Sequence, residues 1–165
     1  MASKLPIVRQ SSISGQLASV TLLLCCFMLG AIIFPDKRLG AIVGAFVYLT
    51  YSRSAKYFIA HHHRLGMSLL QRKNFEAAIK EFESSYEFFT ERPWIDKYRS
   101  LVLVSPSRIS YREMALVNIA FCYGQLRRQD KAKEFYKRTL AEFPGSQIAL
   151  AGLTLLNFDE EFGES

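Results

Sequence analysis

Residues 116–144 read LVNIAFCYGQLRRQDKAKEFYKRTLAEFP, and the spacing of their apolar residues predicts two helices joined by a short polar turn. Small Ala120 on the first predicted helix and Ala132 on the second stand where two helix backbones have to approach each other. Pro144 follows the second helix, and proline cannot continue a helix because it lacks the amide hydrogen. The stretch therefore predicts a helix–turn–helix unit with its apolar residues between the two helices.

The same pattern occurs once more, earlier in the chain. Gly66 stands in the place of Ala120, and Ala78 stands in the place of Ala132 at the same offset in residue number. Recurring pairs of helices are typical of α-helical arrays, in which neighbouring units bury a shared core. We therefore predict an all-α protein with one unit at 59–92 and a second at 113–146.

Both units resemble the tetratricopeptide repeat (TPR) family, whose members place small, aromatic and proline residues at fixed positions of a two-helix unit. The second unit carries the resemblance at Ile119, Ala120, Tyr123, Ala132, Tyr136 and Pro144, while Leu116 stands where Trp is frequent. The first unit carries it at Leu65, Gly66, Ala78 and Phe82, with Leu69 in place of an aromatic residue. The first unit departs from the family at two further places. His62 stands where Trp is frequent, and Thr90 replaces the closing proline.

The TPR resemblance implies stacked helix pairs and a concave groove lined by the first helix of each pair. Such a groove binds a protein or peptide partner. Carried onto this sequence, the residues expected to line it are His63, Arg64, Met67, Gln71, Asn118, Phe121 and Gln125. Some family members hold a peptide carboxylate with a set of basic and amide side chains. Ala151 and Gly152 stand where a basic residue of that set would be needed, so a carboxylate clamp is not expected.

Capping residues indicate where the helices begin. Asn74 and Asp130 are expected to cap the second helix of each unit, and Ser110 is expected to cap the first helix of the second unit. Ser146 is expected to start a last helix, which covers the apolar end of the array. We place this capping helix at 147–157, the repeat domain as a whole at 59–158, and a loose acidic tail at 159–165.

An insertion at 93–112 separates the two units. Trp94, Tyr98 and Leu101 lie at helical spacing on one side of it, with charged residues between them. The insertion is expected to form an extra helix that packs on the repeats. The alternative is an amphipathic segment that lies on a bilayer, because Trp and Tyr favour the membrane interface.

The first third of the chain is apolar and indicates a membrane anchor at 17–58. The eighteen residues from Leu17 to Phe34 carry no charge. As a helix they reach about 27 Å, close to the roughly 30 Å of a hydrocarbon core. A second apolar stretch follows, and Arg53 and Lys56 at its end can extend their charged groups into water. We predict a polar tail at 1–16 and a transmembrane helical hairpin with spans at 17–34 and 39–56.

Two alternatives remain open for this region. The uncharged part of the second stretch is short, so that stretch can instead be re-entrant or lie on the membrane surface. The other alternative is a cleavable signal peptide, because Gly30 and Ala31 are small residues that come after the most apolar part of the first stretch. No proline occurs from Leu39 to Arg72. The second span is therefore expected to run continuously, or with one kink, into the first repeat helix.

The net charge of +6 is concentrated beside the predicted spans. Residues 1–58 carry six Lys and Arg and one acid, whereas 59–165 carry fifteen Lys and Arg and fourteen acids. Basic residues in that position orient spans and do not form a polyanion-binding surface, so no nucleic-acid partner is expected. The positive-inside rule favours both chain ends in the cytoplasm. We expect a bacterial inner membrane, with an organellar membrane as the alternative.

No residue pattern in the sequence indicates an enzyme, a metal site or a cofactor. Adjacent residues on a helix point about 100° apart, so His61, His62 and His63 cannot bind one metal together. Cys122 lies between two aromatic residues of a predicted core helix, where a buried thiol is expected. No catalytic, metal-binding or cofactor-binding residue is therefore predicted.

The sequence accordingly predicts a membrane-anchored TPR-like adaptor or scaffold at the cytoplasmic face of a membrane. Its partners are expected to be a protein or peptide in the groove and the lipid bilayer around 17–58. The alternative is an accessory subunit of an integral membrane enzyme or transporter, in which the hairpin carries the main role. The sequence indicates neither the identity of the partner nor the oligomeric state.

Overall fold

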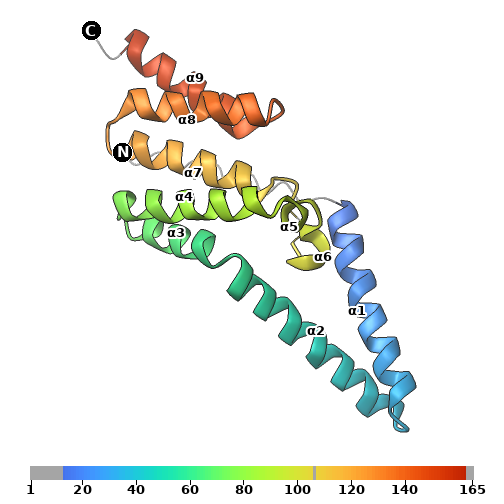
Figure 1. Ribbon diagram of the computed structural model, residues 1–165. Helices are drawn as coiled ribbons and strands as arrows, with labels where there is room; N and C mark the ends of the chain where they lie inside the picture. The colour runs from blue at the N-terminus through green and yellow to red at the C-terminus, as the bar shows by residue number, and fades with distance from the viewer. Residues whose placement is uncertain (1–12, 106, 163–165) are drawn as a thin grey trace. The chain divides into compact units, whose positions relative to one another are not determined.

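The computed structural model describes residues 13–105 and 107–162, which form helices joined by short turns, with no strand among them (Figure 1). The helices are α1 (Ile13–Ile33), α2 (Lys37–Ile59), α3 (His61–Gln71), α4 (Phe75–Glu91), α5 (Pro93–Lys97), α6 (Arg99–Val102), α7 (Tyr111–Gln125), α8 (Gln129–Glu142) and α9 (Gln147–Phe162). The predicted all-α class is thus confirmed. Most of the polar tail expected at 1–16 lies outside the described residues, and α1 begins within it at Ile13.

The chain divides into two compact units that are not contiguous in sequence. The first comprises Met1–Ile59 and Lys97–Ile109, and the second comprises Ala60–Asp96 and Ser110–Ser165. The insertion was expected to form one extra helix packed on the repeats. It instead forms the two short helices α5 and α6, and Lys97–Ile109 belong to the unit of the N-terminal hairpin. The reason is visible at α6, which lies against α1.

The first unit is built on an antiparallel hairpin of α1 and α2. Asp36 caps the start of α2, since its Oδ1 accepts a hydrogen bond from the Arg38 amide at 2.9 Å. The two helices approach closely at glycines. A methyl group at Gly30 would lie 2.9 Å from the carbonyl carbon of Gly40, and one at Gly44 would lie 2.9 Å from that of Cys26. Small residues four apart, as Gly40 and Gly44 are, permit such backbone contact.

Within the described residues, one helical segment, Gly15–Ile33, is long and apolar enough to cross a membrane. Only 6 % of this segment is buried in the structure. The apolar side chains of α1 and α2 therefore point mostly outward and are not part of a protein core. Helix α2 ends at Ile59 and α3 starts at His61, so Ala60 alone interrupts the run that was expected to be continuous or kinked once.

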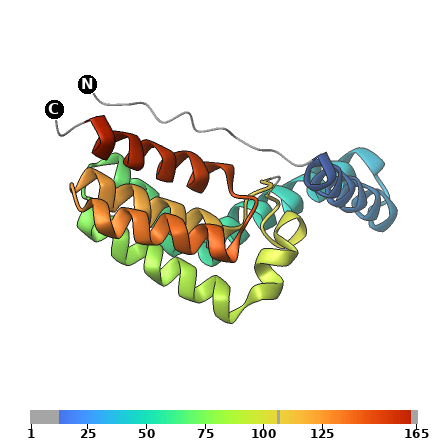
Figure 2. The same ribbon diagram turned by 90° about the horizontal axis from the view of Figure 1, so that it is seen from above.

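The second unit consists of two helix pairs and a terminal helix. Helix α3 packs on α4, and α7 packs on α8. Helix α7 lies between α4 and α8 (Figure 1), while α9 runs along α8 (Figure 2). The two pairs correspond to the predicted units at 59–92 and 113–146.

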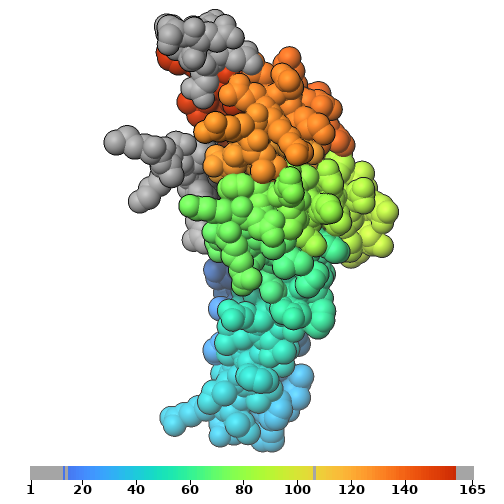
Figure 3. Space-filling view, turned by 90° about the vertical axis from the view of Figure 1, so that its left-hand side faces the viewer, coloured from blue at the N-terminus to red at the C-terminus, as the bar shows by residue number. Residues whose placement is uncertain are grey.

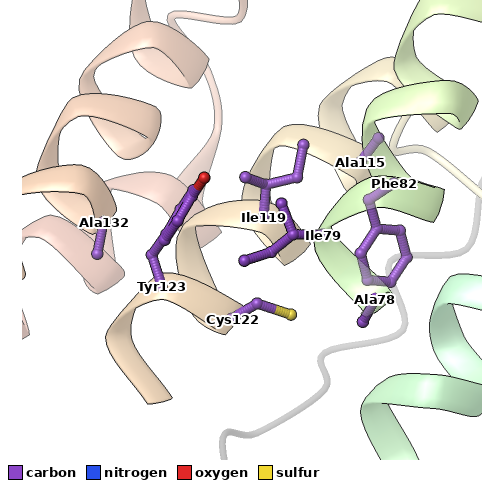
Figure 4. Packing of buried hydrophobic residues seen from close by; sticks show 8 residues of the cluster. All are labelled: Ala78, Ile79, Phe82, Ala115, Ile119, Cys122, Tyr123 and Ala132. Atoms are coloured by element: carbon purple, nitrogen blue, oxygen red, sulfur yellow. The ribbon is translucent and has the colours of Figure 1, made fainter. Parts of the chain in front are cut away.

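The core of the second unit lies between the two pairs. It contains Ala78, Ile79 and Phe82 from α4, Ala115, Ile119, Cys122 and Tyr123 from α7, and Ala132 from α8 (Figure 4). Ala78 and Ala132, the small residues of the repeated pattern, are both fully buried. Phe82 and its counterpart Tyr136 fill the space left by small residues on neighbouring helices. A methyl group at Gly152 would lie 2.7 Å from Cε1 of Tyr136.

Most of the expected caps are present. The side chain of Asn74 accepts from the Ala77 amide at 3.4 Å, and that of Ser110 accepts from the Glu113 amide at 3.0 Å. The cap expected at Asp130 is wrong. Helix α8 starts at Gln129, with Arg128 as its N-cap and no side-chain cap, so Asp130 lies in the first turn, where its charge favours the helix dipole.

The last helix is longer than predicted. Its start is capped by Ser146, whose Oγ accepts from the Ala149 amide at 3.4 Å. The helix then continues past Asn157 to Phe162, so the acidic residues expected in a loose tail begin inside α9. Nothing in the sequence there breaks a helix, because the first glycine of the tail is Gly163.

Candidate partner-binding site

The turns between paired helices have the same backbone geometry in both units. Lys73 and Arg127, at equivalent positions of the two units, have positive φ angles of 60° and 57°. The amide of Lys73 donates to the Leu70 carbonyl at 2.9 Å, and that of Arg127 donates to the Gly124 carbonyl at 3.0 Å. This left-handed residue followed by a new helix ends α3 and α7 in the same way. Both turns face the viewer in Figure 3, the first in green and the second in orange.

The first helices of the two units are neighbours, as the predicted groove requires. Helix α3 contacts α7. Nδ2 of Asn118 on α7 donates to the sulfur of Met67 on α3, at 3.6 Å. Two of the predicted groove residues are therefore in direct contact, and they come from different repeats.

Six of the seven predicted groove residues form three pairs at equivalent repeat positions. The pairs, each separated by the same offset in residue number, are Arg64 with Asn118, Met67 with Phe121, and Gln71 with Gln125. Arg64, Gln71 and Gln125 are exposed, whereas Met67, Asn118 and Phe121 are half-buried. The face thus combines a partly buried floor of amide, thioether and aromatic groups with polar groups at its surface.

His63 was expected in the groove, and this expectation is wrong. Its side chain is 8 % exposed, and its ring makes edge contacts with Phe82 at 5.5 Å and Tyr111 at 5.1 Å. Burial lowers the pKa of His63 to about 4, so the imidazole is neutral near pH 7. The equivalent residue of the second unit, Val117, is also buried at 8 % exposure. This repeat position is a packing position in both units.

Asp96 fixes the start of α7. Its two carboxylate oxygens accept from the amides of Tyr111 at 2.9 Å and Arg112 at 3.2 Å. Together with Ser110 it satisfies three amides of the first turn, which have no partner within the helix. The carboxylate is buried and also favoured by the positive end of the helix dipole. Asp96 thereby connects the start of the insertion to the helix that carries Asn118 and Phe121.

Glu142 joins three helices of the second unit. Its carboxylate accepts from Tyr86 Oη on α4 at 2.8 Å, from Arg112 Nη2 on α7 at 2.7 Å, and from Arg138 Nε on α8 at 3.2 Å. The guanidinium of Arg138 also lies over the Tyr86 ring, 4.7 Å from its centre. This cluster stabilises the stacking of the two repeats and so the spacing between the halves of the candidate site.

The described residues contain no group of three or more His, Cys, Asp and Glu side chains that could hold a metal ion. Two of the three adjacent histidines are exposed, and Nδ1 of His62 lies 2.9 Å from Glu81 Oε2. Burial raises the pKa of the Cys122 thiol to about 12, so this thiol stays protonated and is a poor nucleophile.

The matching helix pairs, shared turn geometry and paired surface positions describe a repeated unit. Residues 114–146 match the tetratricopeptide repeat family model. The matched segment covers most of α7, all of α8 and the turn after it. Searches of the curated proteins and of the solved structures gave no match to this chain. The first TPR-like unit therefore rests on its internal equivalence to the second.

Sequence reasoning missed two features that position the TPR-like site. Asp96 lies well before Ser110 in the chain, and no local pattern indicates that it caps the same helix end. Glu142 was one of many acids on helix surfaces, and only the packing of three helices distinguishes it. Sequence reasoning also missed a feature of the hairpin, although a known pattern indicates it. The Gly40-x-x-x-Gly44 spacing in an apolar stretch is a known signal for close helix packing.

Proposed function

We propose that this protein is a membrane-anchored adaptor that presents a TPR-like domain to a protein or peptide partner at the cytoplasmic face of a membrane. The observation that carries the proposal is the TPR match at 114–146, because domains of this family typically bind proteins. The proposed binding face consists of Arg64, Met67, Gln71, Asn118, Phe121 and Gln125.

The chemistry of this face suits an amphipathic segment. Phe121 and Met67 are half-buried, so an apolar partner side chain would cover their remaining surface. Around them, the exposed amides of Gln71 and Gln125 both donate and accept hydrogen bonds. A helix or extended peptide with one apolar face and polar flanks matches this arrangement.

The anchor is supported by the exposure of α1. A core helix of a soluble protein would be mostly buried, but only 6 % of Gly15–Ile33 is buried. A cleaved signal peptide would not need a close partner helix either. Instead the backbone of α1 meets that of α2 at Gly30, Gly40 and Gly44, as helices do in lipid.

The register of the hairpin supports a second span. Gly30 lies opposite Gly40. The two helices are antiparallel. Thirteen residues from this contact toward the open end of the hairpin, Leu17 on α1 is therefore level with Arg53 on α2. The uncharged stretch of α1, about 27 Å, therefore lies level with residues 36–53, of which 39–52, about 21 Å, carry no charge. Lys37 and Arg38 at one end and Arg53 at the other are placed to extend into the two headgroup layers.

The distribution of basic residues supports the proposed orientation. Lys37 and Arg38 lie at the turn of the hairpin, whereas Arg53 and Lys56 lie at its open end. The insertion residues that belong to the same unit, 97–109, add three basic residues and no acid. A larger basic count at the open end favours that end in the cytoplasm. We propose a bacterial inner membrane as the location.

The experiment is affinity capture of the full chain from detergent-solubilised membranes. Arg64→Ala with Phe121→Ala should abolish recovery of a partner that the wild type retains. Lys80→Ala with Lys137→Ala, on exposed positions of α4 and α8, is the control and should leave recovery unchanged. Unchanged recovery with the first pair of substitutions would show that the binding face lies elsewhere.

A change of the hairpin surface separates the adaptor from an accessory subunit of an integral membrane complex. The exposed apolar side chains of residues 13–59 are exchanged for other apolar side chains, while the glycines of the helix crossing and Tyr51 are kept so that 97–109 retain their packing, and partner capture is repeated. An adaptor keeps its partner, because binding depends on α3 and α7. A subunit that acts through its spans loses it.

A further inference from the structure

Helix α6 is attached to a fixed level of the N-terminal hairpin. Oη of Tyr51 on α2 donates to the carbonyl oxygens of Val102 at 3.2 Å and Leu101 at 3.4 Å. These carbonyls lie at the C-terminal end of α6, where no partner within the helix is available. Helix α6 also lies against α1. The position of α6 along the hairpin is therefore set by Tyr51.

Tyr51, to which α6 is attached, lies at the edge of the apolar part of the hairpin. Tyr51 is two residues before Arg53, which is level with Leu17, the first residue of the uncharged stretch of α1. If the hairpin spans a bilayer, as proposed above, Tyr51 lies at the boundary between hydrocarbon and headgroups. Tyrosine is enriched at this boundary because it has an apolar ring and a polar hydroxyl.

The surface of α6 and its flanking residues has the chemistry of an interfacial segment. Tyr98 is 50 % exposed and Leu101 is 46 % exposed. The ammonium of Lys97 lies 5.6 Å from the centre of the Tyr98 ring. Across 97–109 there are three basic residues and no acid. Aromatic and apolar groups beside cations favour the interface of a membrane that contains anionic lipid.

Hydrogen bonds hold the described residues of this segment together. The side chain of Arg99 donates from Nε to the Ser107 carbonyl at 3.1 Å and from Nη2 to the Arg108 carbonyl at 2.6 Å. The Ser105 amide donates back to the Arg99 carbonyl at 3.2 Å. The loop after α6 is thus held to the start of α6, and exposed Arg108 is kept beside it. Little conformational entropy would be lost when this surface binds.

We propose that residues 97–105 and 107–109, with Tyr51 and the end of α2, bind the headgroup layer of an anionic membrane. Tyr98 and Leu101 enter the layer, while Lys97 and Arg108 contact lipid phosphates. A second copy of the chain is a poorer occupant. Two-fold docking of this face on itself would bring basic residues together with no acid to pair them, and like charges oppose such an interface.

The depth of the segment is measured with a single tryptophan in the full chain, reconstituted in phospholipid vesicles. Trp94 is the only tryptophan, so Trp94→Phe removes the native signal and Tyr98→Trp introduces a reporter. Quenching is compared between nitroxides on the lipid headgroup and at the end of the acyl chain. We expect the headgroup nitroxide to quench several-fold more strongly. Leu101→Trp in the same background gives a second, independent reporter.

Gln129→Trp in the Trp94→Phe background is the matched control. It places the reporter at the exposed start of α8. Neither nitroxide should quench it appreciably. Quenching at Tyr98→Trp and Leu101→Trp that is no stronger than at Gln129→Trp would overturn the proposal and would indicate a protein occupant or none.

The preference for anionic lipid is measured with the same reporter. Headgroup-labelled phosphatidylglycerol should quench more than equally labelled phosphatidylcholine when both lipids are present. Lys97→Gln with Arg108→Gln should reduce that preference by about fivefold for each basic residue removed. Lys80→Gln with Lys137→Gln should not change it. An equal response to both labelled lipids in the wild type would contradict the role of the basic residues.

This inference rests on the proposed membrane anchor. An alkaline carbonate wash distinguishes a failure of the anchor from a failure of this inference alone. Vesicles are treated with alkaline carbonate, which removes peripheral proteins. Release of the chain would overturn the anchor and this inference together. Retention of the chain without headgroup quenching would overturn this inference alone.

Discussion

Gly66 on α3 lies directly against the ring of Phe82 on α4. A methyl group at Gly66 would be 2.8 Å from Cε1 and 2.9 Å from Cδ1 of that ring. Phe82 has no exposed surface, so the ring cannot move aside without displacing its neighbours in the core. Gly66→Ala should therefore destabilise the protein by about 1–3 kcal/mol, despite the better helix propensity of alanine. Urea unfolding in mild detergent, followed by circular dichroism, measures the change.

Gly124 on α7 provides the matched control for that substitution. No atom lies within 4 Å of the position that its methyl group would take. Gly124→Ala should then stabilise the protein by up to about 1 kcal/mol, since only the helix propensity changes. Equal destabilisation by both substitutions would contradict the role of Phe82 and indicate a general intolerance of side chains on these helices.

His63 should make the protein sensitive to acid. Its pKa is lowered from 6.5 to about 4 by burial, so the unfolded chain binds a proton more tightly than the folded one. The free energy of unfolding should fall as the pH drops from 6.5 to about 4 and should not fall further from this cause below that range. The expected loss is about 3 kcal/mol. His63→Leu should remove this part of the pH dependence, as measured by urea unfolding at several pH values.

Exposed histidines serve as the comparison for His63. His61 and His62 both lie on the surface at the start of α3. His61→Leu should leave the wild-type slope between neutral and acidic pH unchanged. A slope that persists in His63→Leu would instead assign the acid sensitivity to other groups.

Removal of Glu142 should loosen the stacking of the two repeats. Glu142→Ala leaves Tyr86 and the half-buried Arg112 without their shared acceptor. The expected cost is about 1–3 kcal/mol of unfolding free energy, because a partly buried charge loses its partner. Glu91→Ala is the control, since Glu91 pairs with Arg92 on the surface and should contribute less than about 1 kcal/mol. Similar losses for the two substitutions would count against the cluster.

Bulky residues at the helix crossing should open the hairpin. Gly44→Leu forces a side chain into the backbone of α1, where a methyl group would already be 3.1 Å from Cα of Phe27. The thermal transition of the first unit in detergent should fall by several degrees or be lost. Thr50→Leu, at an exposed position of the same helix, should leave it unchanged. Tolerance of Gly44→Leu would mean that α1 and α2 do not need close contact.

The repeats could be predicted from the sequence because their signals are local and occur twice. Ala78 and Ala132, related by the offset between the two units, are both at the core. The same offset relates three pairs of predicted groove residues, and all six are exposed or half-buried. The prediction failed at His63 because a polar residue on a first helix was taken to face the groove. Comparison with Val117, its equivalent, would have indicated a packing position.

Features set by turn geometry or by contacts distant in sequence could not be predicted. Asp130 is a good capping residue, but the turn with Arg127 in the left-handed conformation starts α8 earlier. The assignment of 97–109 to the hairpin depends on Tyr51, which is 50 residues away from Leu101. No periodicity within the insertion carries that information.

The division of the chain limits how the protein can be truncated and how its gene can recombine. The backbone passes between the two units after Ile59, after Asp96 and after Ile109. No single cut therefore frees the repeat unit as a continuous polypeptide. A chain truncated to begin at Ala60 would still contain Leu103 and Val104, which are buried in the full protein and belong to the missing unit. We expect such a truncated chain to aggregate, and recombination would have to move both units together as one gene segment.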